Sequence, residues 1–130
     1  ENLTATGWWD ADAWLRSTLD VLVIYGDTAI VMDWKTGKRR VDTFQMDLFA
    51  AQTFKHFPQV QKVKTSLVWL KTSEMDTELY TRININERWA EIMGKIQRIY
   101  MSLDHDNWPA KPSGLCRYCP ARHDCDDAQI

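Results

Sequence analysis

The chain has 130 residues, of which 45% are hydrophobic and 26% are charged, and its formal net charge is −2 at pH 7. This length fits one domain with a single core. No apolar run approaches the roughly 20 residues of a membrane-spanning helix, and no basic stretch followed by an apolar one resembles a secretion signal. The small negative charge excludes a general attraction to nucleic acid, so a polyanion would have to be held by local basic clusters or by metal ions. We therefore expect an intracellular protein that contacts no membrane.

The first predicted elements are two strands, over residues 14–25 and 28–35, which meet at Gly26-Asp27. Both runs are rich in β-branched and apolar residues, and glycine suits the first central position of a type II′ hairpin turn. If these two residues form the loop, Tyr25 pairs with Thr28, and counting outward places residue 20 opposite residue 33 and residue 18 opposite residue 35. The sequence thus predicts an antiparallel hairpin with a fixed register.

A helix is predicted from residue 42 or 43 to Pro58, because apolar residues recur there at helical spacing and proline restricts the residue before it. Two further strands, over residues 63–71 and 77–83, flank a polar turn at residues 73–76. An amphipathic helix follows from Ile85 to Tyr100, and its apolar stripe is expected to pack on the sheet. The pattern predicts an α/β fold, with a central mixed sheet of four or more strands flanked by helices.

A polar, proline-bearing stretch after Leu103 leads to a tail that contains all three cysteines. We therefore expect residues 1–103 to form the core and residues 104–130 to form a cysteine-bearing tail of the same domain. The seven tryptophans are a noticeable excess. Trp14 and Trp89 fall within predicted elements and are assigned to packing, whereas Trp8 and Trp9 are candidates for exposure.

Two acids and a lysine stand out within the apolar hairpin. In the predicted register Asp20 lies directly opposite Asp33, where like charges about 5 Å apart destabilise a sheet unless a cation lies between them. Carboxylate oxygens at this separation suit Mg²⁺ or Mn²⁺. Lys35 shares the face of Asp33, where its ammonium group can neutralise phosphate charge or orient water. This set predicts metal-assisted phosphodiester hydrolysis, and the alternative is that the acids are merely solvated on an outer face.

These residues resemble the RecB-like branch of the PD-(D/E)XK nucleases. The pattern of that branch is an Asp ending one strand, (D/E)-x-K on the next strand, and Gln-x-x-x-Tyr on the following helix. Asp20, Asp33-Trp34-Lys35 and Gln45 match it in order and spacing, while Phe49 replaces the tyrosine, losing a hydroxyl and preserving an aromatic face. The resemblance covers residues 14 to 125 and is strongest to phage-encoded members.

The resemblance implies a restriction-endonuclease-like core and a Mg²⁺- or Mn²⁺-dependent deoxyribonuclease. It implies an exonuclease of phage or recombination and repair type, acting on single-stranded DNA or duplex ends, with a recombination protein as partner and the host cytoplasm as location if phage-encoded. Asp20, Asp33 and the main-chain carbonyl of Trp34 would ligate the metal, Lys35 would activate or position water, and Gln45 would support it. Family members usually carry a further acidic or histidine ligand on a preceding helix, which this sequence does not display. Either the sequence is truncated or the protein is a naturally reduced member of the family.

The cysteines Cys116, Cys119 and Cys125 cannot all pair internally, and their crowding is more typical of metal ligation than of a disulfide framework. Their spacing resembles that of the iron–sulfur members of the branch, which implies a [4Fe–4S] cluster completed by an upstream cysteine. A Zn²⁺ site with His123 as fourth ligand is the alternative. A Cys116–Cys119 disulfide ranks last for an intracellular protein.

The densest basic run is Lys38-Arg39-Arg40, directly after the site strand, and it is expected to hold a DNA backbone next to the metal. Arg16 shares the predicted face of Asp20 and is a candidate either for a hydrogen-bond donor that supports the metal ligands or for a phosphate contact. Two rival functions are a catalytically inactive DNA-binding or scaffold module of the same fold, and a zinc- or cluster-bearing interaction domain whose acids are incidental.

Overall fold

The computed structural model describes residues 4–40 and 42–128. By its internal contacts the chain divides into two compact units, residues 1–93 and residues 94–130. The first unit holds the sheet, helix α1 and the first turns of helix α2 (Ile85–Asp104), and the second holds the rest of α2 and a short 3-10 helix, η1 (Cys116–Tyr118). No helix in the described part of the chain is long and apolar enough to cross a membrane.

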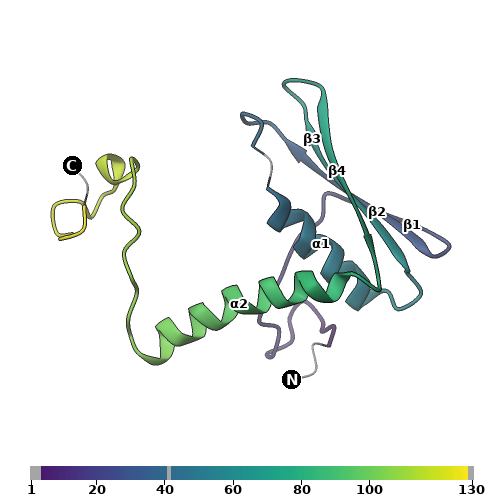
Figure 1. The fold of residues 1–130 in the computed structure, drawn as a ribbon, viewed down its shortest axis with the longest axis horizontal. Coiled ribbons are helices and arrows are strands. Elements are labelled where there is room, and N and C mark those ends of the chain that lie inside the picture. The colour runs from purple at the N-terminus through teal and green to yellow at the C-terminus, as the bar shows by residue number, and fades with distance from the viewer. Residues whose placement is uncertain (1–3, 41, 129–130) are drawn as a thin grey trace. The chain divides into compact units, whose positions relative to one another are not determined.

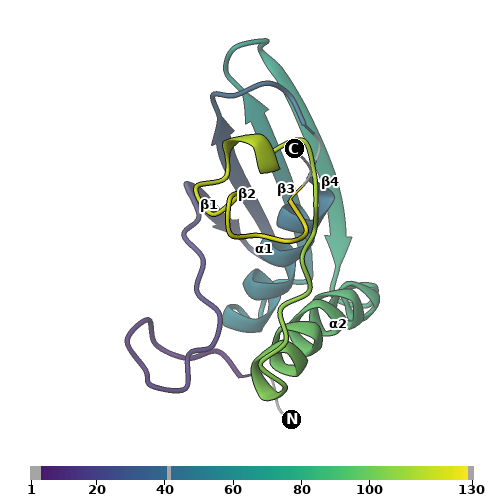
Figure 2. The same ribbon diagram turned by 90° about the vertical axis from the view of Figure 1, so that its left-hand side faces the viewer.

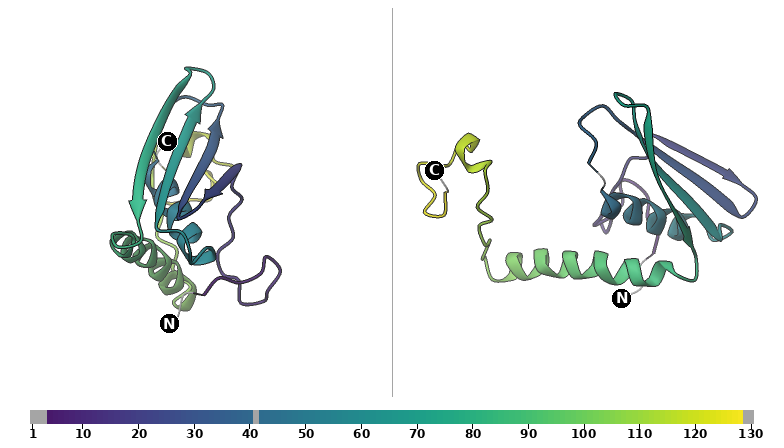
Figure 3. Two further views of the ribbon diagram at one scale, coloured as in Figure 1. Left: turned by 90° about the vertical axis from the view of Figure 1, so that its right-hand side faces the viewer. Right: turned by 45° about the horizontal axis from the view of Figure 1, so that its top comes forward.

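The first unit is built on a four-stranded sheet in the order β1-β2-β3-β4 (Figure 1; Figure 3, left). The strands are β1 (Val21–Tyr25), β2 (Thr28–Lys35), β3 (Lys62–Trp69) and β4 (Glu74–Thr81). Strands β2 and β3 are parallel, whereas the outer pairs are antiparallel. Helix α1 (Thr43–His56) makes the crossover between the parallel strands, as such a connection requires. The predicted mixed sheet is thereby confirmed.

The β1–β2 hairpin has the predicted register. Tyr25 pairs with Thr28, the ladder continues to Val21 opposite Met32, and Gly26 has a φ of 59°, which glycine adopts readily. The predicted start of the strand at residue 14 is wrong, because β1 begins at Val21. The predicted pairs of residues 20 with 33 and 18 with 35 therefore lie outside the ladder. The Arg16 guanidinium donates to the main-chain oxygens of Trp8 and Asp10, at 2.6 and 3.2 Å, and so ties the preceding segment to an earlier loop instead of to β2.

Helix α1 packs on one face of the sheet (Figure 2). Side chains alternate between the two faces of a strand, and those of β2 and β3 that face α1 form the core with the buried side of the helix. The fully buried members of this core are Ala29, Val31, Val63, Leu67, Met46, Ala50 and Phe54. The predicted helix, mostly covered by protein, is confirmed.

A buried polar pair joins α1 to the edge strand β4. The Tyr80 hydroxyl donates to Asp47 Oδ1 over 2.8 Å, and Arg88 Nε lies 3.7 Å from the same oxygen. Burial and the hydrogen bond to Asp47 raise the pKa of Tyr80, so the phenol stays protonated and remains a donor. The pair therefore satisfies a buried carboxylate that would otherwise be costly.

The second hairpin turns earlier than predicted. Residues 70–73 form the turn, with Ser73 at a φ of 54°, and the polar residues Glu74 and Asp76, which were predicted to lie in it, begin β4 instead. Their charges are tolerated in the strand because Arg39 pairs with both. In α2, Ile85 and Ile92 of the predicted apolar stripe are buried.

Candidate active site

Strand β2 presents two charged side chains on the face that α1 covers. Asp33 and Lys35 are two residues apart and therefore project from the same side of the strand. Asp33 is buried, at 8% exposed, while the Lys35 side chain keeps 28% of its surface exposed. Trp69, the β3 register partner of Lys35, is buried beside it. The pair thus lies at the carboxyl end of β2, half open to solvent.

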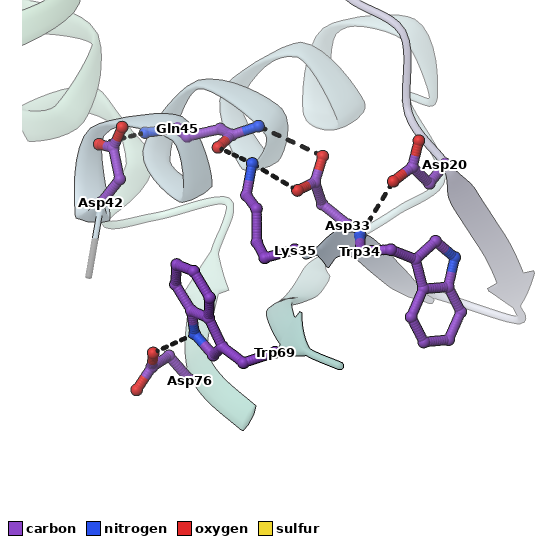
Figure 4. Close-up of polar contacts among 8 residues, drawn as sticks. All are labelled: Asp20, Asp33, Trp34, Lys35, Asp42, Gln45, Trp69 and Asp76. Carbon is purple, nitrogen blue, oxygen red and sulfur yellow. Dashed lines mark hydrogen bonds and ion pairs between the residues drawn. The ribbon is translucent and has the colours of Figure 1, made fainter. Parts of the chain in front are cut away.

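The side chains of Asp33, Lys35 and Gln45 form a closed ring of polar contacts (Figure 4). Lys35 Nζ lies 2.6 Å from Asp33 Oδ2 and donates to Gln45 Oε1 over 2.8 Å. Gln45 Nε2 donates to Asp33 Oδ1 over 3.3 Å. The amide oxygen faces the ammonium group and the amide nitrogen faces the carboxylate, so the one amide group of Gln45 serves as acceptor and donor at once and closes the ring.

Gln45 is held in position by the start of its own helix. The Asp42 carboxylate caps α1 by accepting the Gln45 main-chain N–H over 3.2 Å. Asp42 did not figure among the predicted site residues, although Asp-x-x-Gln before an apolar run is a capping signal that the sequence displays. Phe49, one turn further along α1, is 5% exposed and belongs to the core.

Asp20 directly precedes β1, just outside the main-chain hydrogen bonds between β1 and β2. Its Oδ2 accepts the main-chain N–H of Trp34 over 2.9 Å. In the hairpin register the main-chain partner of Trp34 would be residue 19, so the Asp20 carboxylate replaces a missing ladder bond. Asp20 and Asp33 lie on the same side of the β2 main chain, with the Trp34 indole on the other side (Figure 4). Two carboxylates near one strand end are a set that Mg²⁺ accepts together with water and phosphate oxygens.

A family model described as the PD-(D/E)XK nuclease superfamily matches residues 5–126. The chain belongs to this superfamily. No match was found among curated proteins or among solved structures. Membership and the four-stranded mixed sheet confirm the predicted α/β, restriction-endonuclease-like fold. Membership also implies a nuclease with DNA as substrate, and nucleases of this superfamily generally use divalent metal ions such as Mg²⁺.

The four basic residues predicted to contact DNA are all exposed, but two of them already bind other groups of this chain. Arg39 contacts Asp76 through two nitrogens and Glu74 Oε1 over 3.2 Å, while Arg16 binds main-chain oxygens. The hydrogen bond from Arg39 lowers the pKa of Asp76, and the indole N–H of Trp69, which donates over 2.7 Å, acts in the same direction. The exposed residues Lys38 and Arg40 flank Arg39, and all three line one surface hollow.

The cysteines lie in the second unit. Cys116 is partly buried at the start of η1, where its Sγ accepts the Ser113 N–H over 3.3 Å, whereas Cys119 and Cys125 are exposed. In the described part of the chain, no disulfide joins any of the three. His123 Nε2 accepts a hydrogen bond from the neighbouring Arg122 over 3.0 Å. Among residues 4–40 and 42–128, no three His, Cys, Asp or Glu side chains gather into a group that could hold a metal ion.

Proposed function

We propose that this chain is a Mg²⁺- or Mn²⁺-dependent deoxyribonuclease of the RecB-like branch, acting exonucleolytically on single-stranded DNA or duplex ends. The observation that carries the proposal is the closed ring of Asp33, Lys35 and Gln45 beside Asp20. A solvated outer face would leave these side chains apart, whereas here a buried carboxylate, an ammonium group and an amide are mutually oriented. Such fixed polar geometry is what stabilisation of a charged transition state requires.

Asp20, Asp33 and the main-chain carbonyl of Trp34 would hold the divalent ion. When bound, the ion supplies Lewis-acid polarisation of the phosphate and a water of lowered pKa. The donor set fits, because Mg²⁺ uses one or two carboxylates and keeps sites for water and phosphate oxygens. Asp20 is exposed, and the Trp34 N–H binds its Oδ2, so its Oδ1 would be the oxygen that contacts the ion.

Lys35 would act on the phosphate side of the reaction. Its ammonium group would donate hydrogen bonds to the negative oxygens of the scissile phosphate and can orient the attacking water. Gln45 would act through Lys35, because its amide oxygen fixes the direction of the ammonium group while its amide nitrogen holds Asp33. Gln45 is thus a positioning residue for both the lysine and the acid.

DNA would be held by phosphate contacts near the end of β2. Lys38 and Arg40 are exposed directly after the site strand, and Arg39 beside them would exchange its acidic partners for phosphate. Arg16, which precedes the hairpin, would contact a further phosphate of the DNA backbone. Contacts of this kind position a strand without reading its sequence.

The remaining features of the proposal rest on the resemblance. These are the exonuclease preference, a phage or recombination and repair role, a recombination protein as partner, and an intracellular location. Residues 104–130 are proposed as a tail of the nuclease domain in which Cys116, Cys119 and Cys125 ligate a [4Fe–4S] cluster or Zn²⁺. The tail would take no part in the reaction itself. Metal analysis and the visible absorbance of freshly purified protein distinguish an iron–sulfur cluster from Zn²⁺.

The test is cleavage of linear and covalently closed circular DNA, in single- and double-stranded form, with Mg²⁺, Mn²⁺ or a chelator. The proposal predicts metal-dependent release of nucleotides from linear DNA and none from closed circles. Cleavage of closed circles would refute the exonuclease preference but would still support the assignment as a nuclease. Metal-independent DNA binding without cleavage of any substrate would favour the inactive DNA-binding module.

A further inference from the structure

One carboxylate outside the ring of polar contacts joins two elements that border the site. Asp76 Oδ2 accepts the indole N–H of Trp69 over 2.7 Å, a bond drawn in Figure 4. The same oxygen accepts the Nε–H of Arg39 over 3.1 Å, and Arg39 Nη2 contacts Asp76 Oδ1. Trp69 belongs to β3 and Arg39 to the loop after β2, so one side chain of β4 connects the sheet to that loop.

Trp69 is the neighbour of Lys35 on the next strand. The two residues are register partners in the parallel β2–β3 pair, and Leu70 N–H donates to Lys35 O over 2.9 Å just beyond them. Their side chains leave the same face of the sheet about 5 Å apart, and Trp69 is buried. The hydrogen bond to Asp76 fixes the direction in which the indole ring points. The surroundings of Lys35 therefore depend on Asp76.

The other partner of Asp76 is a residue expected to contact DNA. Arg39 is exposed, and it also contacts Glu74 Oε1 over 3.2 Å. A guanidinium group binds carboxylate and phosphate oxygens with the same planar set of donors. The two acids thus occupy Arg39 as a phosphate would, and a DNA strand has to displace them. The hydrogen bond from Arg39 also lowers the pKa of Asp76, which keeps the carboxylate charged at neutral pH.

Displacement of Arg39 would alter the contact between Asp76 and Trp69. With Arg39 on a phosphate, the carboxylate keeps its charge and loses its cation, while the indole N–H remains its partner. A hydrogen bond to an ionised acceptor is about twice as strong as a neutral one, and here the acceptor oxygen would no longer be shared with Arg39. DNA binding and the orientation of the indole are therefore linked through one side chain.

We propose that Asp76 is a positioning residue for the cleavage reaction, with two separable roles. It orients the Trp69 indole beside Lys35, and it holds Arg39 until a DNA phosphate takes its place. The inference rests on the proposed function for the identity of the reaction. It deepens that function, because the arrangement around Lys35 would respond to DNA bound at Arg39.

The experiment separates the two roles with variants of the full chain. Asp76→Ala removes both contacts, whereas Asp76→Asn keeps an oxygen for the indole and loses the charge that holds Arg39. Trp69→Phe removes the N–H and keeps an aromatic ring. Glu78→Ala is the matched control, because Glu78 is an exposed acid on the same strand. Single-turnover cleavage is measured with enzyme in excess, and DNA affinity is measured by fluorescence anisotropy with no divalent ion added.

The proposal predicts that Asp76→Ala and Trp69→Phe each slow cleavage about 10-fold and that combining them slows it no further. Asp76→Asn should recover most of the rate lost in Asp76→Ala. Because enzyme is in excess, an unfolded fraction of a variant does not alter the rate constant. A wild-type rate in Trp69→Phe, or additive losses in the double variant, would overturn the role of the indole.

Both Asp76 variants should bind DNA about 2- to 5-fold more tightly than wild type, the range expected for release of one exposed ion pair. Glu78→Ala should leave the cleavage rate unchanged and give a smaller gain in affinity. Equal gains in Glu78→Ala and Asp76→Ala would show that only the overall charge matters, which would overturn the restraint of Arg39.

A measurement without cleavage distinguishes failure of this inference from failure of the proposed nuclease. In ¹⁵N-labelled protein, the Trp69 indole N–H signal is identified by its loss in Trp69→Phe. This signal should move when oligo(dT) binds wild type and should move less in Arg39→Gln. A chain that cleaves no DNA but shows this shift contradicts the nuclease and supports the link. A chain that cleaves DNA while the signal stays fixed at saturating oligo(dT) contradicts only the link.

Discussion

The ammonium nitrogen of Lys35 lies 2.6 Å from Asp33 Oδ2, on the face of β2 that α1 covers. This contact places the two charged groups of the (D/E)-x-K pattern within reach of one ligand. Gln45 bridges them from the helix, and Asp20 lies at the neighbouring strand end.

Replacing Lys35 with methionine removes the ammonium group and keeps the length of the side chain. The rate of DNA cleavage should fall by at least about 100-fold, as expected for loss of a donor to developing phosphate charge, while DNA affinity changes little. Lys64→Met is the matched control, because Lys64 projects from the opposite face of the sheet and is exposed. A single-turnover assay measures the cleavage rates of both variants, and equal rates would argue against a role for Lys35.

Gln45→Leu breaks both contacts of the bridging amide. We expect cleavage to slow about 10- to 100-fold, the range typical of residues that orient a ligand-bearing side chain. Metal affinity should weaken at the same time, since Asp33 loses its amide donor. Gln97→Leu, an exposed change on α2, serves as control. If Gln45→Leu retained full activity and metal affinity, the positioning role would be lost.

Asp42→Ala removes the cap of α1. The free energy of unfolding in urea should fall by about 1 kcal/mol, because the Gln45 main-chain N–H loses its acceptor. Cleavage should fall much less than in Lys35→Met, since the side-chain ring remains. Thr36→Ala, in the exposed loop after β2, is the comparison. Unchanged stability in Asp42→Ala would show that the cap contributes nothing.

The Arg39–Asp76 pair predicts a pH dependence. The hydrogen bond from Arg39 lowers the pKa of Asp76 in the folded chain, so its stabilising effect is present above the unfolded pKa of about 3.9 and is lost as the pH falls through the lower folded value. Wild type should therefore be more stable than Asp76→Asn at neutral pH, and the difference should shrink in acid below about pH 4. Urea unfolding across this range measures it, and a constant difference would contradict the assignment.

The same substitution tests how Arg39 is used. Asp76→Asn frees the guanidinium of one acidic partner, so DNA should bind more tightly and lose affinity more steeply with salt. Asp104→Asn, at the end of α2, is the control for the change of charge. An unaltered salt dependence would indicate that Arg39 does not contact DNA.

Local signals in the sequence were sufficient for the register of the hairpin and for the proximity of Asp33, Lys35 and Gln45. Gly26-Asp27 determines the register, and the period of two places Lys35 on the same face as Asp33. Helical spacing brings Gln45 to the first turn of α1. Each of these relations spans few residues along the chain.

Distant partners explain what the sequence could not predict. Arg16 leaves the predicted strand because main-chain oxygens eight and six residues earlier accept its hydrogen bonds. Glu74 and Asp76 lie in β4 instead of a turn because Arg39, more than thirty residues away, neutralises them.

The most direct test is the single-turnover rate of DNA cleavage in Mg²⁺ for wild type and Asp33→Asn. The substitution keeps the size of the side chain and its place in the ring but removes the charge that would hold the ion. We predict metal-dependent cleavage by wild type and a rate lower by at least about 100-fold in the variant. Equal rates for the two proteins, or no cleavage by wild type in either Mg²⁺ or Mn²⁺, would contradict the account.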